Sequence, residues 1–593
     1  MWFLKDLGRL NAEREAIEAL EAEREWLDGV RFYLGKSKLT VDATITVDDT
    51  SSYPVRLTFP DLYPSSPATV RPQDPKLDLS DHQYLNGDLC LELGPDNWHP
   101  DSHNAAQLLE SAYRLLSLEV EHAADEAVDI PSRHALTPGQ AMRTKFLRWI
   151  VTPEVRAALN ALPDGPSYRC DVIDLFHEDA ITAFLQEIES TDGTENWCDP
   201  NVPVSLKNPG RRVRGVIVTR PIDPMTLVQL DKPDVLTGLL HDPAVPDSQD
   251  SDADNDLANV TYVFHKSFGG AWQAHCRWSS GEKVWTTSAV DADTEAPAAR
   301  HGLDADRLAS VNVAIVGLGS VGSKVAASLA RSGVRQFCLL DDDLLHPANL
   351  VRNDLDWSDV GQHKVDAVAD RLLRIHPDTK ILRRRHRLRG QESSESAASA
   401  LSAIAQTDLI VDASANPSVY TLCAHVARQA KRPLVWMEVF AGGIGGLVAR
   451  ARPDQDAEPF TLRAAILSAA DEMAEQKGVE ALEATINYGA EVEDEIVTAC
   501  DADVSVMAAH ATQIALDTLL ARDPSRFRHP AYLVGFSAEW VFEEAFHTIP
   551  VDCSAPVDWS TTIETDKATR ERAAGFIIKL MEDLPTDAPA KTS

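Results

Sequence analysis

The chain has 593 residues, of which 44% are hydrophobic, and a formal net charge of −36 at pH 7. This length allows about three domains, each with its own buried core. The acidic charge argues against a nucleic-acid or anionic-membrane partner, because both attract basic surfaces. No apolar run is long enough to cross a membrane and no secretory leader follows Met1, so a cytoplasmic protein is expected.

The first 130 residues predict a compact α+β domain. Helical spacing over residues 9–28 is followed by the strand-like segments KLTVDATITV and YPVRLTFP. A Pro-rich corner, the loop LNGDLCLELGPDNWHP around Cys90 and a helix in NAAQLLESAYRLLSLEVEH complete this domain.

Residues 131–299 predict a middle region of helices (TPEVRAALNAL, EDAITAFLQEIE) and strands (RRVRGVIVTR, ANVTYVFHKS). The acidic stretch HDPAVPDSQDSDADNDLA interrupts them as a solvated loop or linker. No motif gives this region a chemistry.

Residues 300–555 predict an α/β domain with a doubly wound, mostly parallel sheet. VNVAIVGLGSVGSKVAASLARSG predicts a strand, a Gly-rich turn and a helix, and RQFCLLDDD and TDLIVDASAN predict strands with polar ends. From residue 556 the sequence predicts a tail with one amphipathic helix and a partly disordered end.

The eight cysteines include no C-x-x-C pair, which fits neither a disulfide framework nor a structural zinc site. In a reducing compartment a thiol can serve as a nucleophile. Cys90 lies among acidic, Gly and Pro residues, and Cys500 immediately precedes a predicted helix whose dipole favours a thiolate. Cys338 and Cys423 fall in an apolar strand and a helix, so both are expected in the core.

A nucleotide site is predicted where the first strand of the third domain meets its helix. The glycines of a G-x-G-x-x-G motif stand there: Gly317, Gly319 and Gly322. Such glycines let the backbone approach a phosphate, and the helix N-terminus favours its negative charge. Asp341, at the end of the next strand, could bind a ribose. The cations that follow, Arg352 and Lys364, suit a triphosphate and its leaving pyrophosphate, which disfavours an NAD-dependent oxidoreductase. Both cations are expected on surface loops.

Over roughly residues 300–550 these motifs resemble the activating enzymes of ubiquitin-like proteins and their bacterial sulfur-carrier relatives. That family adds N-L-x-R and V-G-x-x-K, which correspond to Asn349–Arg352 and Val360–Lys364. The resemblance implies binding of ATP with Mg²⁺ and adenylation of a partner protein's C-terminal glycine. It also implies a homodimer in which Arg300 or Arg307 reaches the nucleotide of the partner subunit.

The same resemblance implies a magnesium-binding acid and a nucleophilic cysteine. Ala415 stands where the family has its Asp, so the nearby Asp412 is the candidate metal ligand, with Asp343 as an alternative. Cys500 matches the cysteine that accepts the activated carboxylate, and Cys553 is the alternative.

Residues 1–125 resemble a ubiquitin-conjugating enzyme. Cys90 matches the thioester-forming cysteine of that family, and Trp98–Pro100 match its W-x-P. The family's Asn, which helps to hold an oxyanion, has no clear match. Its candidate replacements are His82, Asn86, Asn97 and His99.

Together the two domains resemble the fused enzymes of bacterial antiphage operons of the CBASS type, which attach a cGAS-like nucleotidyltransferase to other molecules. The resemblance implies ATP-dependent activation, transfer through thioesters on Cys500 and Cys90, and conjugation to an amine. Two alternatives stay open: conjugation of a separate bacterial ubiquitin-like protein, and a non-catalytic nucleotide-binding scaffold.

Overall fold

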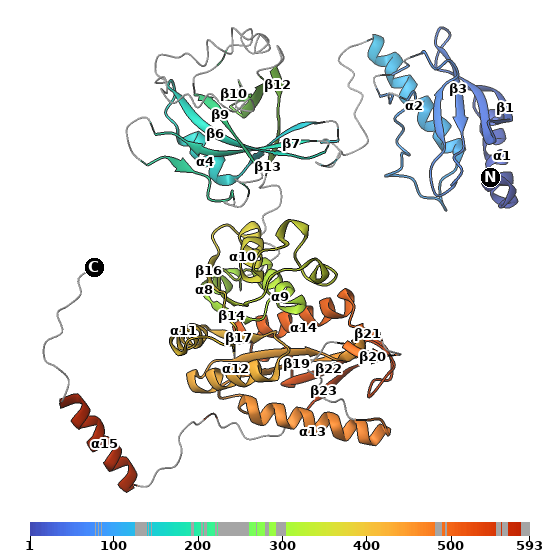
Figure 1. Ribbon diagram of the computed structural model, residues 1–593. Helices are drawn as coiled ribbons and strands as arrows, with labels where there is room; N and C mark the ends of the chain where they lie inside the picture. Colours follow the sequence, from blue (N-terminus) through green and yellow to red (C-terminus); the bar gives the residue numbers. More distant parts are fainter. Residues whose placement is uncertain are drawn as a thin grey trace. The chain divides into compact units, whose positions relative to one another are not determined.

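The structure is a computed structural model (Figure 1). It describes residues 1–77, 79–80, 82–84, 86–124, 139, 142–143, 145–178, 180–190, 195–202, 206, 210–219, 222, 260–267, 270–278, 284–291, 304–388, 390–480, 489–492, 495–552, 559 and 567–582. The chain divides into two compact units, Met1–Thr144 and Lys145–Ser593. All the predicted domain boundaries, at 130, 299 and 555, lie outside the described residues.

The first unit contains an antiparallel sheet of strand order β1-β2-β3-β4 and two long helices. Its elements are η1 (Trp2–Leu4), α1 (Leu7–Glu23), β1 (Leu27–Gly35), β2 (Lys38–Thr46), β3 (Ser52–Thr58), β4 (Thr69–Pro72) and α2 (Ala105–Ala124). Leucines recurring along α2 pack with Ile17 of α1 and Ile45 and Leu57 of the sheet in one core. The helix predicted over 9–28 ends earlier, because Leu27 begins a strand that the sequence did not predict.

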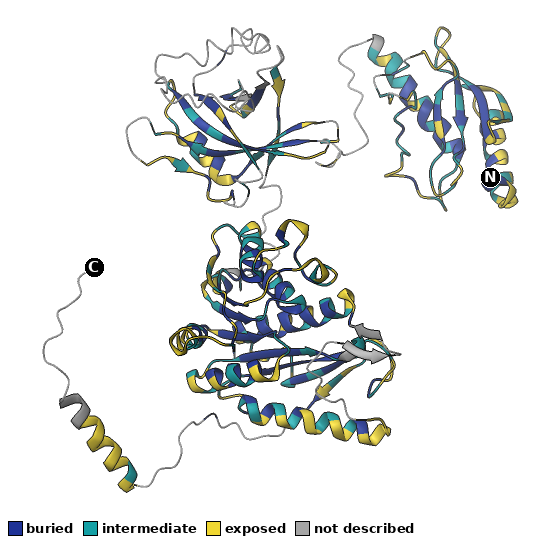
Figure 2. Cartoon of the chain, viewed as in Figure 1, coloured by how far each residue is buried: buried dark blue, intermediate teal, exposed yellow. Residues whose placement is uncertain are grey.

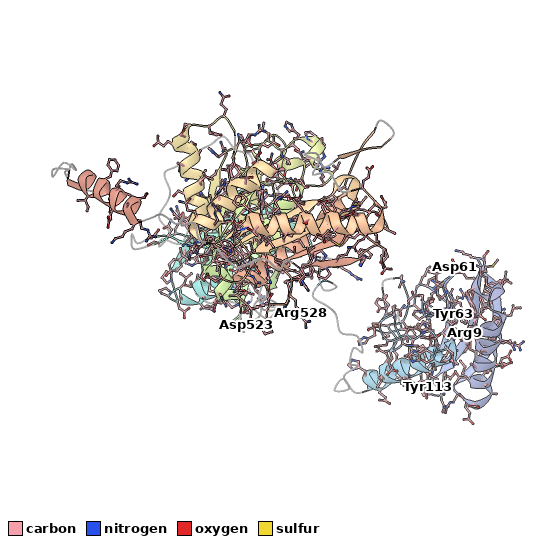
Figure 3. The ribbon with its side chains drawn as sticks, turned by 90° about the horizontal axis from the view of Figure 1, so that it is seen from below. Arg9, Asp61, Tyr63, Tyr113, Asp523 and Arg528 are labelled. Carbon is pink, nitrogen blue, oxygen red and sulfur yellow. The ribbon has the colours of Figure 1, made fainter. Side chains whose placement is uncertain are left out.

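A buried polar cluster joins the start of α1 to the loop before α2. Glu13 is 1% exposed, and it accepts from the backbone N–H of Ala105 at 2.7 Å and pairs with Arg9 at 2.7 Å. Arg9 also donates to the Tyr63 hydroxyl at 3.1 Å and to the Pro100 carbonyl at 2.9 Å (Figure 3). The pairing of the Glu13 carboxylate with Arg9 and the Ala105 N–H offsets part of the desolvation cost of burial, and removing one partner would leave a buried charge uncompensated.

In its described residues, the second unit contains two large sheets and a two-stranded sheet of β20 and β21. The first has the strand order β12-β11-β10-β9-β6-β7-β5-β13, with β8 beside β7. Its elements are β5 (Leu147–Val151), α4 (Pro153–Ala161), β6 (Ser167–Phe176), β7 (Ile181–Ile188), β8 (Trp197–Cys198), β9 (Arg211–Val218), β10 (Val260–Lys266), β11 (Trp272–Trp278), β12 (Val284–Thr286) and β13 (Ser288–Asp291). The helix predicted in EDAITAFLQEIE is wrong, since this segment is strand β7. Pairing with β5 and β6 on its two sides outweighs the helix propensity of its Ala, Leu, Gln and Glu residues.

The other large sheet has the order β16-β15-β14-β17-β18-β19-β22-β23, parallel from β16 to β18 and antiparallel beyond. The first part of this domain comprises α8 (Ala305–Ser310), β14 (Asn312–Val316), α9 (Ser320–Arg331), β15 (Gln336–Leu340), η4 (Pro347–Asn349), η5 (Trp357–Asp359), α10 (Lys364–Ile375), β16 (Lys380–Arg384), α11 (Ser394–Ala405), β17 (Leu409–Asp412) and α12 (Pro417–Ala430). The second comprises β18 (Leu434–Val439), η6 (Ala441–Gly443), β19 (Gly445–Ala451), α13 (Pro459–Lys477), β20 (Gly489–Val492), β21 (Glu495–Thr498), α14 (Asp501–Leu519), β22 (Ala531–Gly535) and β23 (Thr548–Val551).

Helices cover both faces of this sheet, as the predicted α/β doubly wound class requires. Residues of α9, α10 and α14 share one core with the sheet, and residues of α11, α12 and α13 share the other. The central strands β14, β15 and β17 are buried except at the first residues of β14 and β15 (Figure 2). Parallel strands buried on both faces explain the continuous apolar runs in their sequences.

One ion pair lies inside the same domain. Arg450 of β19 is 0% exposed, and it donates to Asp517 of α14 at 2.7 Å and to the Phe527 carbonyl at 2.8 Å.

The predicted tail helix is present as α15 (Lys567–Glu582). Among the described residues, none of the helices is both long and apolar enough to cross a membrane.

Candidate nucleotide and thiol sites

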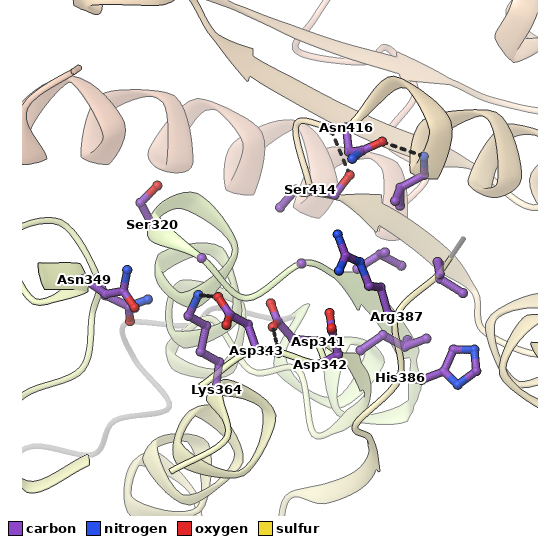
Figure 4. Close-up of a pocket in the computed structure, with 18 of the residues that line it drawn as sticks. Ser320, Asp341, Asp342, Asp343, Asn349, Lys364, His386, Arg387, Ser414 and Asn416 are labelled. Carbon is purple, nitrogen blue, oxygen red and sulfur yellow. Dashed lines mark hydrogen bonds and ion pairs between the residues drawn. The ribbon is translucent and has the colours of Figure 1, made fainter. Parts of the chain in front are cut away.

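A cavity of about 500 Å³ opens at the carboxyl ends of β14, β15 and β17 (Figure 4). In open α/β sheets ligands bind at this edge, where the strand order reverses. The cavity gathers six of the predicted nucleotide-site residues from distant parts of the sequence: Gly317, Gly319, Asp341, Asn349, Arg352 and Lys364. Its volume is within the usual range for small-ligand sites.

The three glycines of the motif have different structural tasks. Gly317 has φ +86°, and a Cβ there would lie 2.8 Å from the Ser414 Cα. A Cβ on Gly322 would lie 1.9 Å from the Gly317 carbonyl oxygen, so the backbone itself requires both glycines. A Cβ on Gly319, by contrast, would meet nothing within 4 Å. The open space above Gly319 belongs to the cavity, where α9 begins, and fits a phosphate held by backbone N–H groups.

Asp341 is tied to the glycine-rich turn. Its carboxylate accepts from the backbone N–H of Leu318 at 2.6 Å and from that of Asp343 at 2.9 Å. Burial raises the pKa of Asp341, against the lowering effect of these two hydrogen bonds. The carboxylate is thereby fixed at the cavity wall, in the position predicted for a ribose partner.

Lys364 differs from its prediction as a surface-loop cation. It is the first residue of α10, only 7% exposed, and its Nζ lies 2.5 Å from the Asp343 carboxylate. Burial acts to raise the pKa of Asp343, but the hydrogen bond and charge of Lys364 lower it. A buried lysine of this kind needs a carboxylate partner, and the pair fixes the ammonium group at the cavity.

Asn349 and Arg352 enter the cavity from the segment after β15. The Asn349 side chain accepts from the backbone N–H of His346 at 3.0 Å, which closes the 3₁₀ turn η4. Arg352 follows this turn, and its backbone N–H donates to the Asn349 carbonyl at 3.2 Å. Asn353, 8% exposed, donates to the Leu318 carbonyl at 3.3 Å and so attaches this segment to the glycine-rich turn.

The cavity also contains a cation that the sequence did not single out. Arg387, in the loop after β16, lines the wall opposite Lys364 together with His386 (Figure 4). The basic run RRRHRLR was the available signal, but only the pairing of β16 with β15 brings its end to the cavity. Ser414 and Asn416, at the start of α12, complete the same wall.

The candidate metal ligand Asp412 lies outside the cavity lining. It is 3% exposed, and its Oδ1 accepts from the Ser414 hydroxyl at 2.6 Å and from the Ser414 backbone N–H at 3.0 Å. Burial raises the pKa of Asp412 to about 6. The acids that line the cavity are Asp341, Asp342 and Asp343. Among the described side chains, no group of three or more His, Cys, Asp or Glu is arranged to hold a metal.

Cys500 is exposed at the N-cap of α14, as predicted from the sequence. Its backbone N–H donates to the Asp503 carboxylate at 3.0 Å, and the next residue, Asp501, pairs with Lys324 of α9 at 2.9 Å. Lys324 lies one helical turn, about 6 Å of rise, beyond Ser320 at the cavity. This ion pair therefore ties the start of α14 to the helix that begins at the glycine-rich turn. The alternative thiol, Cys553, lies outside the described residues.

Cys90, in the first unit, is half-buried at a groove against α2 of about 350 Å³. Leu91, Leu115 and Leu118 give the groove an apolar lining, and at its rim Glu92 pairs with Arg114 at 2.6 Å. The Cys90 sulfur lies 3.4 Å from the Tyr84 hydroxyl.

The predicted substitutes for the missing asparagine lie around Cys90 in different roles. His82 lines the same groove, and its carbonyl accepts from the Cys90 N–H at 2.7 Å. Asn86 donates to Asp88 at 2.9 Å, and Asn97 donates to the Glu92 carbonyl at 3.0 Å. The backbone N–H of His99 donates to the His103 ring at 2.9 Å. The two asparagines therefore hydrogen-bond within their own loops.

The motifs at the cavity agree with a family match. Residues 296–529 match the ThiF family. This match confirms the predicted resemblance of the third domain. It covers the cavity residues, Cys500 and the strands of the sheet up to β19, and it ends before β22.

Similar curated proteins extend the resemblance. The chain is 33% identical over 158 residues to "Uncharacterized protein y4oA" of Sinorhizobium fredii, covering 25% of this chain and 27% of that protein. It is 29% identical over 165 residues to "ATP-dependent ubiquitin transferase-like protein Cap2" of Pseudomonas aeruginosa, covering 27% of this chain and 28% of that protein. The chain thus spans about a quarter of the length of these relatives. The similarity to Cap2 agrees with the predicted likeness to fused bacterial enzymes.

Among solved structures, the chain is similar to E. coli MccB crystallised with ATP. The match has 16% sequence identity and a TM-score of 0.30, and it covers 42% of this chain and 67% of that chain.

Proposed function

We propose that the chain uses ATP to activate the C-terminal carboxylate of a partner protein and passes it through two cysteine thioesters to an amine. The observation that carries this proposal is the tie between the cavity and Cys500. The cavity, with open space over Gly319 and three lining cations, lies at the start of α9. The Lys324–Asp501 ion pair joins α9 to α14, whose N-cap is the exposed Cys500. An oxidoreductase has no use for that combination, and a scaffold does not need the exposed thiol.

The first proposed step is adenylation in the cavity. The N-terminus of α9 and the side chains of Arg352, Lys364 and Arg387 would hold the triphosphate, and Asp341 the ribose. The partner's carboxylate oxygen attacks the α-phosphorus, and the bond from the α-phosphorus to the bridging oxygen breaks. The cations stabilise the charge that passes to the leaving pyrophosphate.

The second and third proposed steps are transfers between thiols. The Cys500 sulfur attacks the acyl carbon, the acyl–phosphate bond breaks and AMP leaves with the electron pair. The Cys90 sulfur then takes the acyl group from Cys500 by thioester exchange. An amine finally attacks the Cys90 thioester, forming an amide and returning the thiol. Covalent steps of this kind divide one difficult substitution into easier ones.

Magnesium binding is part of this proposal, and it would neutralise phosphate charge when bound. We place it at Asp342 and Asp343, whose exposed carboxylates line the cavity, in preference to the buried Asp412. The choice agrees with the oxygen ligands and partial hydration that Mg²⁺ prefers.

The proposed partner is a protein with a C-terminal glycine. The resemblance to CBASS enzymes favours a cGAS-like nucleotidyltransferase, and the curated relative named as a ubiquitin transferase-like protein supports the class of reaction. A separate ubiquitin-like modifier is the second candidate, because the same chemistry serves any exposed C-terminal carboxylate.

We also propose that the third domain forms a homodimer. Two apolar side chains of the segment between β15 and α10, Val351 and Trp357, are each 72% exposed. Such exposed apolar side chains are typical of contact surfaces. Two arginines are candidates to reach the nucleotide of the partner subunit. Arg307 is exposed at the start of this domain, and Arg300 lies outside the described residues. Light scattering that shows a monomer at micromolar concentration, in an active preparation, would contradict the dimer.

The proposed function is tested by incubating the full chain with ATP, magnesium and each candidate partner. We expect partner-dependent exchange of pyrophosphate into ATP, followed by a partner adduct that excess reducing thiol removes. Exchange without any thiol-sensitive adduct would limit the chain to adenylation. ATP binding by the full chain with neither exchange nor a thiol-sensitive adduct would favour the alternative of a non-catalytic nucleotide-binding scaffold.

A further inference from the structure

The loop that carries Cys90 pairs with itself across a tight turn. The Cys90 N–H donates to the His82 carbonyl at 2.7 Å, and the Tyr84 N–H donates to the Asp88 carbonyl at 2.9 Å. Since His82 lies opposite Cys90 and Tyr84 lies opposite Asp88, Tyr84 and Cys90 occupy the same face of this short ladder. They are diagonal neighbours, a separation that an aromatic side chain spans.

This placement brings the Tyr84 hydroxyl into contact with the Cys90 sulfur. In the thiol form the Cys90 sulfur donates to this oxygen at 3.4 Å, while Tyr84 remains 55% exposed. The hydrogen bond with Cys90, followed by burial, raises the pKa of Tyr84 to about 12. The phenol therefore stays protonated near neutral pH and has a proton to donate.

The amide side chains of the same loops have their hydrogen bonds elsewhere. Gln83 donates to the Leu77 carbonyl at 3.2 Å and accepts from the Leu79 N–H at 2.9 Å. Asn86 and Asn97 bond within their own turns, as described above. The hydroxyl beside the thiol thus belongs to a residue that the sequence resemblance does not point to. Once the sulfur carries no proton, a hydrogen bond at this contact can only be donated by the phenol.

We propose that Tyr84 is a catalytic residue that donates its hydroxyl hydrogen bond at Cys90 during amide formation. The proposal rests on the proposed function of Cys90 as a thioester carrier. When the amine nitrogen bonds to the acyl carbon, the carbonyl electron pair moves to oxygen, which lies next to the sulfur and within reach of the hydroxyl. When the carbon–sulfur bond then breaks, the pair moves to sulfur, and the same hydroxyl stabilises the thiolate. The amine proton leaves to solvent.

The test is the substitution Tyr84→Phe in the full chain, which keeps the ring and removes the hydroxyl. Charging of Cys90 from Cys500 should proceed, and transfer from the preformed Cys90 thioester to free lysine should slow by about tenfold or more. This is less than the roughly 100- to 1000-fold typical of an enclosed donor, because Tyr84 is 55% exposed. Tyr53→Phe, on β3, is the matched control and should transfer at the wild-type rate.

A second measurement does not depend on the conjugation reaction. The rate at which iodoacetamide alkylates Cys90 is followed against pH by peptide mass spectrometry. In Tyr84→Phe the midpoint of this curve should move upward by about 0.5 to 1 pH unit, because the thiolate loses a donor. The charged and titratable groups around the thiol are unchanged in this variant: His82, Asp88, Glu92, Asp96 and Arg114.

The two measurements separate the proposals. An unchanged alkylation midpoint together with unchanged transfer to lysine would overturn the role of Tyr84 and leave the proposed function intact. If the wild-type chain never forms a Cys90 thioester, the proposed function fails. The proposal for Tyr84 in catalysis then fails with it, whatever the alkylation curve shows. Slower transfer with a shifted midpoint, at unchanged thermal stability, supports the proposal.

Discussion

The cavity of the ThiF-like domain and the groove at Cys90 are built on different supports. The cavity lies at the ends of buried parallel strands, and one of its cations, Lys364, is fixed by an ion pair with Asp343. Cys90 lies on a loop between β4 and α2, held by short backbone bonds beside an apolar groove. A charged ligand that dissociates needs a rigid, preorganised enclosure, whereas a group carried covalently needs a thiol, a donor and little else. In the proposed function, nucleotide binding therefore belongs to the rigid cavity and acyl transfer to the loop.

Removing each thiol in turn should have the largest effect, and it tests whether Cys500 and Cys90 act in sequence. Cys500→Ala should still form acyl-adenylate, because adenylation requires no cysteine, but it should form no thioester at either site. Cys90→Ala should accumulate the partner on Cys500 and form no amide product. Non-reducing gels with ATP and the partner distinguish the two variants. A thioester on Cys90 in Cys500→Ala would show that another thiol, such as Cys553, accepts the acyl group first.

Removal of a single cavity cation should have the next largest effect. Arg352→Ala or Arg387→Ala should reduce partner-dependent ATP–pyrophosphate exchange by about a hundredfold, the scale of losing a preorganised charge partner. Arg528→Ala, an exposed arginine of the same domain, is the matched control. Wild-type exchange in both cavity variants would remove the case for a triphosphate site.

Substitutions at the glycines separate an effect on stability from an effect on ATP binding. Gly319→Ala should leave the melting temperature unchanged but weaken ATP binding about tenfold, because its new methyl group would occupy the open space of the cavity. Gly322→Ala should lower the melting temperature, since its Cβ would overlap the Gly317 carbonyl. Calorimetric titration with ATP and thermal unfolding measure the two effects. Equal ATP affinity in Gly319→Ala would place the phosphates elsewhere.

The smallest effect on activity is expected from Asp412→Asn. The amide keeps an acceptor for Ser414, so exchange and its magnesium dependence should stay within about threefold of wild type. The pKa of Asp412, about 6 in the folded chain, lies above its ordinary value of 3.8. The folded state therefore binds this proton more tightly, and wild-type stability falls as pH rises from about 4 to 6. The variant should lack that contribution, which melting temperatures across pH 4–7 would reveal. A large loss of magnesium dependence would restore Asp412 as the ligand.

The sequence predicted the parts of the molecule that depend on local pattern. Buried parallel strands have continuous apolar runs, and the Gly-rich turn requires glycines at fixed positions, so both were recognisable. Strand β7 was not, because its residues favour a helix until β5 and β6 pair with it. Lys364 was expected at the surface, since a sequence does not show that Asp343 will accompany it into the protein.

Two site residues depend on pairing between segments, and the sequence pointed to neither. Arg387 reaches the cavity only because β16 pairs beside β15. Tyr84 faces Cys90 only because the intervening residues turn in one register. The predicted candidates beside the thiol were two histidines and two asparagines, whereas the hydroxyl that contacts the Cys90 sulfur belongs to a tyrosine.

The exposure of Cys500 has a kinetic consequence for the proposed cycle. A thioester at an exposed helix start is open to water as well as to the next thiol. Any delay in onward transfer would then release the partner by hydrolysis, and another ATP would be consumed to load it again. The chain should therefore show idle ATP turnover when the partner is present and Cys90 is absent. The ratio of ATP consumed to amide formed would measure how well transfer from Cys500 to the next thiol competes with hydrolysis in the wild-type chain.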